Sequence, residues 1–307
     1  MMLTAGLIAA RFVHFVTLLA LFGGTLFPRY ACERGGRASY RMVEWLRGFA
    51  LAAALLALAS GIAWFLFTAA SMADDLASAG DPQVLASVIQ ATTFGPLWLA
   101  RLALLLVAAA LILFRPRSAR LGWIVPALAA LALMSLAGTG HAEVPGGWQG
   151  ALHAAADAAH LLSAGVWLGA LWPLGMALAR NGGSRGVDDF AVGRLLARFS
   201  GVGLLAVVAL VASGLVNAWY LVGSANRLLT TTYGRMLMVK IALFLTMAAL
   251  AAANRYWIMP AFASARSAGD PRWLDRIRRH VLFEQLLGLC IVGAVSVLGI
   301  LPTASEA

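Results

Sequence analysis

Residues 95–114 read GPLWLARLALLLVAAALILF, a run of 20 residues with one charged side chain, Arg101. A helix of this length is about 30 Å long, which matches the hydrocarbon thickness of a lipid bilayer. Comparable apolar blocks lie on both sides of it, at residues 4–27, 48–70, 121–140, 149–179, 199–222, 235–257 and 281–302. We therefore predict an all-α, polytopic membrane protein whose eight transmembrane helices form a single transmembrane domain over residues 1–307.

The composition excludes other classes of protein. Hydrophobic residues make up 62% of the chain and charged residues 12%, whereas a typical soluble domain is about 25% charged. A soluble domain and intrinsic disorder are both ruled out. A transmembrane β-barrel does not fit, because its strands would alternate polar and apolar residues. The first block has no basic residues before it and no cleavage motif, so we expect a retained helix and not a signal peptide.

Basic residues alternate between the predicted loops and so indicate a topology. The odd-numbered loops hold 18 arginines and the even-numbered loops hold two. Because cytoplasmic loops are enriched in Lys and Arg, we predict cytoplasmic odd loops and both termini outside, in the periplasm. The net charge of +10 thus reports topology and does not indicate a nucleic-acid partner. A short helix is expected at 82–91, in the longest outer loop.

Enzyme and disulfide signatures are missing from the sequence. It has no GxSxG, HExxH, Walker A or dinucleotide-binding motif, so we expect neither an enzyme nor a nucleotide-binding protein. Its two cysteines, Cys32 and Cys290, lie in different segments and suggest no disulfide framework. The GxxxG motif from Gly165 to Gly169 predicts close packing between helices.

Polar side chains inside apolar blocks are the best pointers to function, because burying them in lipid is costly. At about 1.5 Å per residue from the outer end of each helix, His14 and His160 lie about 15 Å deep. Most other polar residues of the spans lie in the outer half of the bilayer. This set comprises Arg11, Arg101, His153, Asp157, Asn217 and Lys240. The asymmetry suggests a site that opens from outside.

The spacing on the fifth span is informative. His153, Asp157 and His160 stand at i, i+4 and i+7, on one helical face. Asp157 is one turn from each histidine, and it could bind a metal ion or accept a hydrogen bond from a ligating imidazole. It could equally neutralise Arg11 or Arg101 at a similar depth.

Structural roles compete with these functional readings. His141 and His153 could be interfacial histidines bonded to water. Arg11, Arg101 and Lys240 could be anchors whose charged ends reach the membrane surface. Three residues near the inner end of the last span are expected at the surface or the interface and not in a site. They are His280, Glu284 and Gln285.

Several ordered motifs resemble the copper-resistance D (CopD) family. They run from HAAADAAHLLSAGVWLGAL at 153–171 through RFS at 198–200, SGLVNA at 213–218 and TTYGR at 231–235 to Lys240 and the NR pair at 254–255. The first half matches less specifically, in architecture and in RFVH at 11–14. The resemblance implies a protein of the bacterial inner membrane that takes part in copper homeostasis. Some members of the family are fused to a copper-binding CopC domain, which this chain lacks, so the resemblance implies that the metal comes from a separate periplasmic carrier of the CopC type or free in the periplasm.

Two functions are compatible with these residues. In the first, copper, as Cu(I) or Cu(II), meets His141 and His153 at the outer mouth and passes inward to a deeper site formed by His14, Asp157 and His160. Arg11, Arg101, Lys240 and Asn217 then pair charges or gate entry. In the second, His14 and His160 ligate a b-type haem in an electron carrier. A copper-binding subunit without transport is a further alternative.

Overall fold

The computed structural model describes residues 2–32, 37–114, 122–137, 147–180, 189–261 and 272–304. These residues form helices and contain no β-strand. The first half consists of α1 (Met2–Ala31), α2 (Arg37–Met72), η1 (Leu76–Gly80), α3 (Pro82–Ala91), α4 (Phe94–Phe114) and α5 (Ile124–Met134). The second half consists of α6 (Trp148–Ala164), η4 (Gly165–Gly169), α7 (Ala170–Arg180), α8 (Asp189–Val222), α9 (Ala225–Thr230), α10 (Thr232–Ala253), η5 (Asn254–Ile258) and α12 (Arg272–Leu298). The prediction of an all-helical protein is confirmed.

Seven helices are long and apolar enough to cross a membrane. In two of them a π-helical segment interrupts a continuous helix: η4 joins α6 to α7, and η5 extends α10. In the described part of the block predicted at 121–140, residues 122–137, the α-helix comprises the 11 residues of α5. At about 1.5 Å per residue, α5 covers about half of the bilayer core. Seven of the eight predicted spans are therefore found as long helices.

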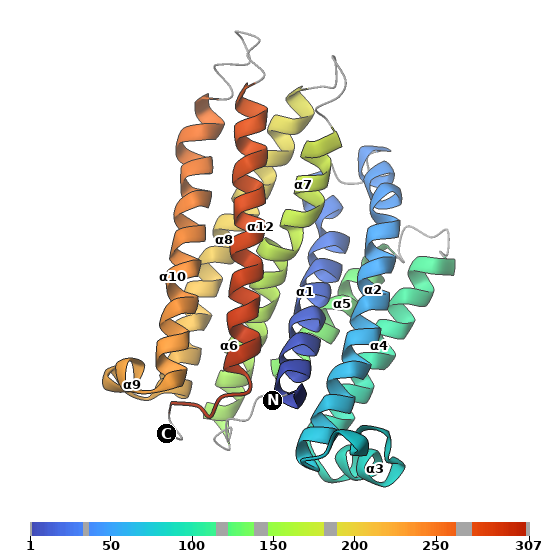
Figure 1. The fold of residues 1–307 in the computed structure, drawn as a ribbon. Coiled ribbons are helices and arrows are strands. Elements are labelled where there is room, and N and C mark those ends of the chain that lie inside the picture. The colour runs from blue at the N-terminus through green and yellow to red at the C-terminus, as the bar shows by residue number, and fades with distance from the viewer. Residues whose placement is uncertain are drawn as a thin grey trace.

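The long helices stand side by side, and both termini lie at the same end of the bundle (Figure 1). The short helices α3 and α9 lie at that end too. The expected helix at 82–91 is present as α3, where Asp81 accepts a hydrogen bond from the Gln83 amide at 2.8 Å. Pro82 follows at the first helical position, where its missing N–H costs nothing.

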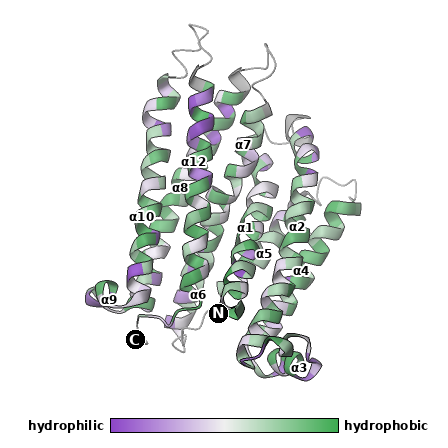
Figure 2. Cartoon of the chain, viewed as in Figure 1, coloured by the Kyte–Doolittle hydropathy of each residue, from purple (hydrophilic) through white to green (hydrophobic). Residues whose placement is uncertain are grey.

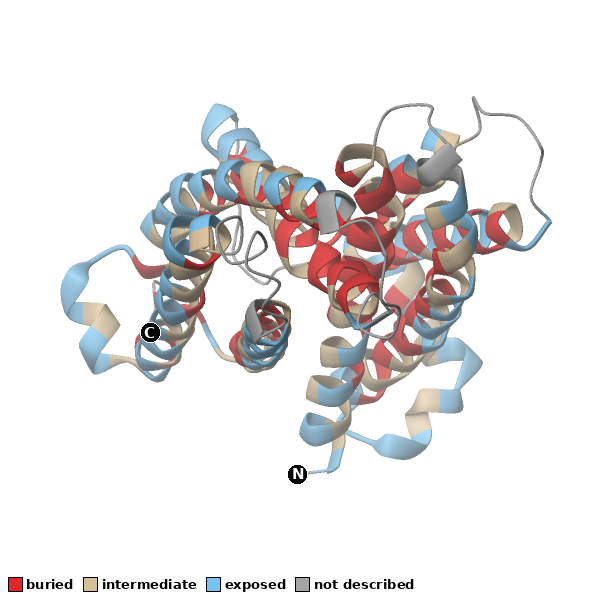
Figure 3. Ribbon diagram, turned by 90° about the horizontal axis from the view of Figure 1, so that it is seen from above, coloured by how far each residue is buried: buried red, intermediate tan, exposed pale blue. Residues whose placement is uncertain are grey.

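Apolar side chains cover the helices along most of their length, and hydrophilic residues concentrate toward helix ends, above all at the start of α12 (Figure 2). Seen along the bundle, buried residues gather where helices face one another, and exposed residues form the outside (Figure 3). Many exposed residues are large and apolar, such as Leu205 and Leu215 on α8. This surface suits a lipid environment, as the composition predicts.

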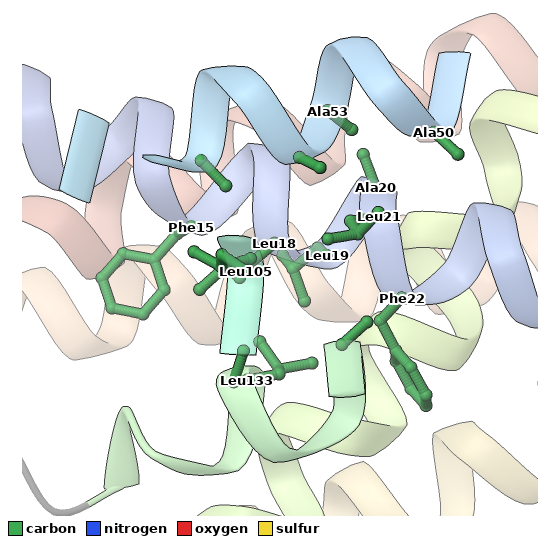
Figure 4. Packing of buried hydrophobic residues seen from close by; sticks show 14 of the residues in the cluster. Phe15, Leu18, Leu19, Ala20, Leu21, Phe22, Ala50, Ala53, Leu105 and Leu133 are labelled. Atoms are coloured by element: carbon green, nitrogen blue, oxygen red, sulfur yellow. The ribbon is translucent and has the colours of Figure 1, made fainter. Parts of the chain in front are cut away.

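Helix α1 is at the centre of one of the two main core clusters. Leu18 and Leu21 are fully buried and pack with Ala50 and Ala53 of α2, Leu105 of α4 and Leu133 of α5 (Figure 4). On another face, α1 meets η4 so closely that a Cβ at Gly169 would lie 1.9 Å from the Leu19 carbonyl oxygen. The close packing predicted from the GxxxG motif is confirmed, and it fixes α1 against the span that carries His160.

Candidate functional site

A row of polar pairs connects α6 to α8. The rings of His153 and Tyr220 stack with centroids 4.8 Å apart. One turn further along α6, Asn217 Nδ2 donates to Asp157 Oδ1 at 3.1 Å. Below it, Nδ1 of His160 lies 3.1 Å from the Ser213 hydroxyl. We call these six residues the polar ladder: His153, Asp157, His160, Ser213, Asn217 and Tyr220.

The ladder follows from the sequence spacing of two antiparallel helices. Positions 153, 157 and 160 share one face of α6, and positions 220, 217 and 213 share one face of α8. Because the helices run in opposite directions, position 153 lies opposite 220, 157 opposite 217 and 160 opposite 213. The sequence predicts the α6 side of this row, and the structure adds Ser213 and Tyr220 on α8.

The hydrogen bonds of the ladder determine the tautomer of His160. The Ser213 hydroxyl donates to the Ala209 carbonyl at 2.6 Å, so its oxygen is left to accept from Nδ1 of His160. A neutral imidazole that donates through Nδ1 keeps a lone pair on Nε2. This is the form in which histidine binds metal ions, and the hydrogen bond holds the ring in place.

Lys240 on α10 belongs to the surroundings of the ladder. Its charge acts on both Asp157 and His160, although no ion pair within 4.0 Å joins Lys240 to Asp157 in the described part of the chain. Asp157 accepts its hydrogen bond from Asn217. Among the described residues no ion pair within 4.0 Å joins Asp157 to Arg11 or Arg101, so the alternative pairing is not seen there.

A second group, which we call the arginine cluster, surrounds Trp64 of α2 and comprises Arg11, His14, Trp64, Arg101 and Ser135. The guanidinium carbons of Arg11 and Arg101 lie 4.9 and 5.4 Å from the Trp64 ring centroid. The rings of His14 and Trp64 meet edge to face at 5.5 Å. Arg101 is fully buried and donates to the hydroxyl of Ser135 at 2.8 Å and to its carbonyl at 2.9 Å.

His14 is held in the same tautomer as His160. It is fully buried, and its Nδ1 lies 2.9 Å from the carbonyl oxygen of Ala57, which can only accept. Nδ1 therefore carries the hydrogen, and Nε2 keeps a lone pair that has no hydrogen-bond partner. Arg11 Nε and Arg101 Nη1 are also buried without partners. Three unpartnered polar nitrogens thus gather in one cluster.

The structure sorts the predicted site residues into two sets. His153, Asp157, His160, Asn217 and Lys240 come together, whereas His14 lies with Arg11 and Arg101. Within the described ranges, no group of three or more His, Cys, Asp or Glu side chains could hold a metal ion. His14, Asp157 and His160 are therefore not gathered into one ligand set here. His141 lies outside the described residues.

Two residues of α12 expected at the interface (Glu284) or at the surface (His280) both form hydrogen bonds with Asn254. Glu284 is only 3% exposed and accepts a hydrogen bond from Asn254 at 2.6 Å. His280, expected at the surface, bonds to Asn254 as well, at 2.7 Å. The expectation was wrong for Glu284, because depth along a helix does not say which face is buried; His280 is partly exposed, as a surface position requires. Their i, i+4 spacing on one face is the signal that could have grouped them.

Comparisons with known proteins match nearly the whole chain. The profile of the copper resistance protein D-like N-terminal domain covers residues 2–151, and that of copper resistance protein D covers residues 193–298. Copper resistance protein D of Pseudomonas syringae pv. tomato is 32% identical over 98% of this chain and 97% of its own length. The chain belongs to the copper resistance protein D family. The resemblance predicted from the motifs is confirmed.

Two further relatives agree with this placement. Inner membrane protein YebZ of Escherichia coli is 29% identical over 96% of this chain and 97% of its own length. Copper transport protein CutJ of Bacillus subtilis is 29% identical over 77% of this chain and 44% of its own length. No solved structure matches the chain. The relatives and the apolar helices thus both support a multi-span protein of the inner membrane, in a family connected with copper resistance.

Proposed function

We propose that this protein binds copper ions in the polar ladder and carries them across the bacterial inner membrane from the periplasm. The observation that carries the proposal is the ladder itself. It places two histidines and one carboxylate in a row along α6, opposite polar partners on α8. Imidazole and carboxylate are both ligands for copper. The membership of a copper resistance family supports copper as the ion.

The site is centred on Asp157 and His160. His160 offers Nε2 as a ligand atom, and Asp157 supplies the negative charge that a cation needs in a low-dielectric surrounding. His153, stacked on Tyr220 at the outer end, would receive the ion first, together with His141 if that residue lies at the mouth. In this proposal both termini are periplasmic, which requires an eighth crossing at the apolar block that contains α5, and a CopC-type carrier delivers the metal.

His14 is less suited to hold a cation. Two guanidinium groups share its cluster, and each repels a positive ion. We therefore assign Arg11 and Arg101 the task of keeping cations on the ladder, and we treat His14 as an additional ligand only if an experiment requires it. This changes the expectation that His14, Asp157 and His160 share one ion.

The decisive experiment is a competition titration with a Cu(I) chelator on the purified protein in detergent. We expect His160→Ala to weaken binding at least about tenfold, or about 1.4 kcal/mol, and His14→Ala to change it less. If both single changes cause the same loss and the double change adds little, the two histidines share one ion. A ladder-centred site would then be wrong.

Two readouts separate the remaining alternatives. Copper uptake into vesicles containing the purified protein tests transport, because a binding subunit would retain affinity and give no flux. An absorption spectrum tests the haem alternative, because a haem bound by His14 and His160 would give a strong Soret band. Such a band, lost in either variant, would contradict a copper site on the ladder.

A further inference from the structure

A third polar group lies away from both clusters, where η5 meets α12. Asn254 begins η5, and its side-chain amide bridges two residues of α12. Its Nδ2 donates to Glu284 Oε1 at 2.6 Å, and its Oδ1 lies 2.7 Å from His280 Nδ1. Because an amide oxygen only accepts, His280 carries the hydrogen on Nδ1. The hydrogen bonds thus run in one direction, from imidazole through amide to carboxyl group.

Glu284 and Asn254 also line a cavity of about 170 Å³. Its other walls come from η4, α7, α8 and α10, and they are mostly apolar, with Trp167 and Phe199 among them. A water molecule occupies about 30 Å³ in the liquid, so the cavity has room for several. Glu284 is therefore buried, at 3% exposure, yet it lines a space large enough for water.

The charges around this carboxyl group are few. Arg255 is the other charged side chain among the described residues that line the cavity, and its Nη1 donates to the Ser200 hydroxyl at 2.7 Å. No described cation lies within ion-pairing distance of Glu284, and the residues that α7 and α8 contribute to the cavity are uncharged. Gln285, the next residue of α12, donates to the Leu171 carbonyl at 2.9 Å.

These contacts favour a neutral carboxyl group over an ion. An ionised carboxylate here would have one side-chain amide donor among the described residues, and burying such a charge without a paired cation costs several kcal/mol. The protonated acid avoids that cost. π-Helical turns such as η5 occur frequently at functional sites, and this one sets the amide of Asn254 against the carboxyl group.

We propose that Glu284 is a proton-binding site, which takes a proton from the water of this cavity and returns it there. Asn254 orients the carboxyl group and stabilises its ionised form, and His280 holds the amide of Asn254 in the required orientation. The ligand is the proton, and the site goes beyond the proposed copper role of the ladder.

The proposal can be tested without copper by labelling with dicyclohexylcarbodiimide, an apolar reagent that modifies protonated carboxyl groups within membranes. The purified protein would be treated at pH values on either side of neutrality, and the labelled peptides would be identified by mass spectrometry. We expect label on Glu284, at a rate that falls about tenfold for each pH unit above the midpoint. Asp275 is the matched control, because it is an exposed carboxylate on the same helix, paired with Arg278 at 2.8 Å. It should stay unlabelled.

A variant tests the part played by the amide. Asn254→Ala removes the hydrogen bond to the carboxylate, so the midpoint of Glu284 labelling should move to higher pH. If Glu284 stays unlabelled, or is labelled at one rate across the range, it is not a proton-binding site. Because no step involves copper, this failure is distinct from a failure of the proposed copper site, which the chelator titration reports.

Discussion

The substitution Gly169→Ala tests the contact that joins α1 to the span carrying His160. A Cβ at position 169 would lie 1.9 Å from the Leu19 carbonyl oxygen and 2.7 Å from its carbon. Ordinary contact begins at 3.4 Å, so α1 and η4 would have to separate by about 1 to 1.5 Å. The opposing atoms are backbone, and no side-chain rotation can relieve the clash. We expect a loss of about 3 kcal/mol, at the upper end of the cost of overpacking a core.

Two other glycines supply a graded comparison. A Cβ at Gly165 would lie 2.5 Å from a ring carbon of Phe22, which can shift, so Gly165→Ala should cost about 1 kcal/mol. A Cβ at Gly201 on α8 would meet nothing within 4 Å. Gly201→Ala should therefore be neutral or stabilise the helix by up to about 1 kcal/mol.

The assay for this series is unfolding of the purified proteins in mixed micelles with an increasing fraction of dodecyl sulfate, followed by circular dichroism. The expected order of stability is Gly201→Ala, then Gly165→Ala, then Gly169→Ala. A Gly169→Ala protein as stable as Gly201→Ala would refute the backbone contact between α1 and η4.

Two further predictions concern charge and topology. Asp157→Asn keeps the shape of the side chain but removes its charge, so copper affinity in the chelator titration should fall about tenfold. The control variant Asp275→Asn should leave the affinity unchanged. If Asp157→Asn binds copper as tightly as the unaltered protein, Asp157 has a structural role. Reporters that are active only in the periplasm should work when fused after residue 304 or inserted near α3, and should fail at 262–271, where activity would reverse the proposed orientation.

Hydropathy predicts most of the helices because long apolar helices must satisfy their own backbone hydrogen bonds in lipid. The exception is α5. The block at 121–140 is apolar throughout, yet the α-helix ends at Met134, and Arg101 of α4 donates to the carbonyl of Ser135 just beyond it. That contact joins two distant segments of the chain, so hydropathy cannot detect it.

The site was predicted in part for a similar reason. Helical periodicity is a local property, so it correctly places His153, Asp157 and His160 on one face. Depth in the membrane is a single coordinate and leaves the direction of a side chain open. His14 and His160 share a depth, yet one contacts Trp64 and the other contacts Ser213. Trp64, about two turns inside the end of its predicted span at residue 70, is a signal that depth reasoning did not use.

The π-helix η4 allows the two halves of one membrane span to pack against different helices. Each residue of an α-helix turns the chain by about 100°, and a π-turn holds one residue more than an α-turn. The register of faces in α7 is therefore offset from that in α6, and the two halves have different neighbours: α6 packs against α8, whereas α7 packs against α1 and α12. Deleting one residue between Gly165 and Gly169 would convert the π-turn into an α-helical turn. The side chains of α7 would then be rotated by about 100° relative to those of α6. The one extra residue of this π-turn thus determines which helix each half of the span packs against.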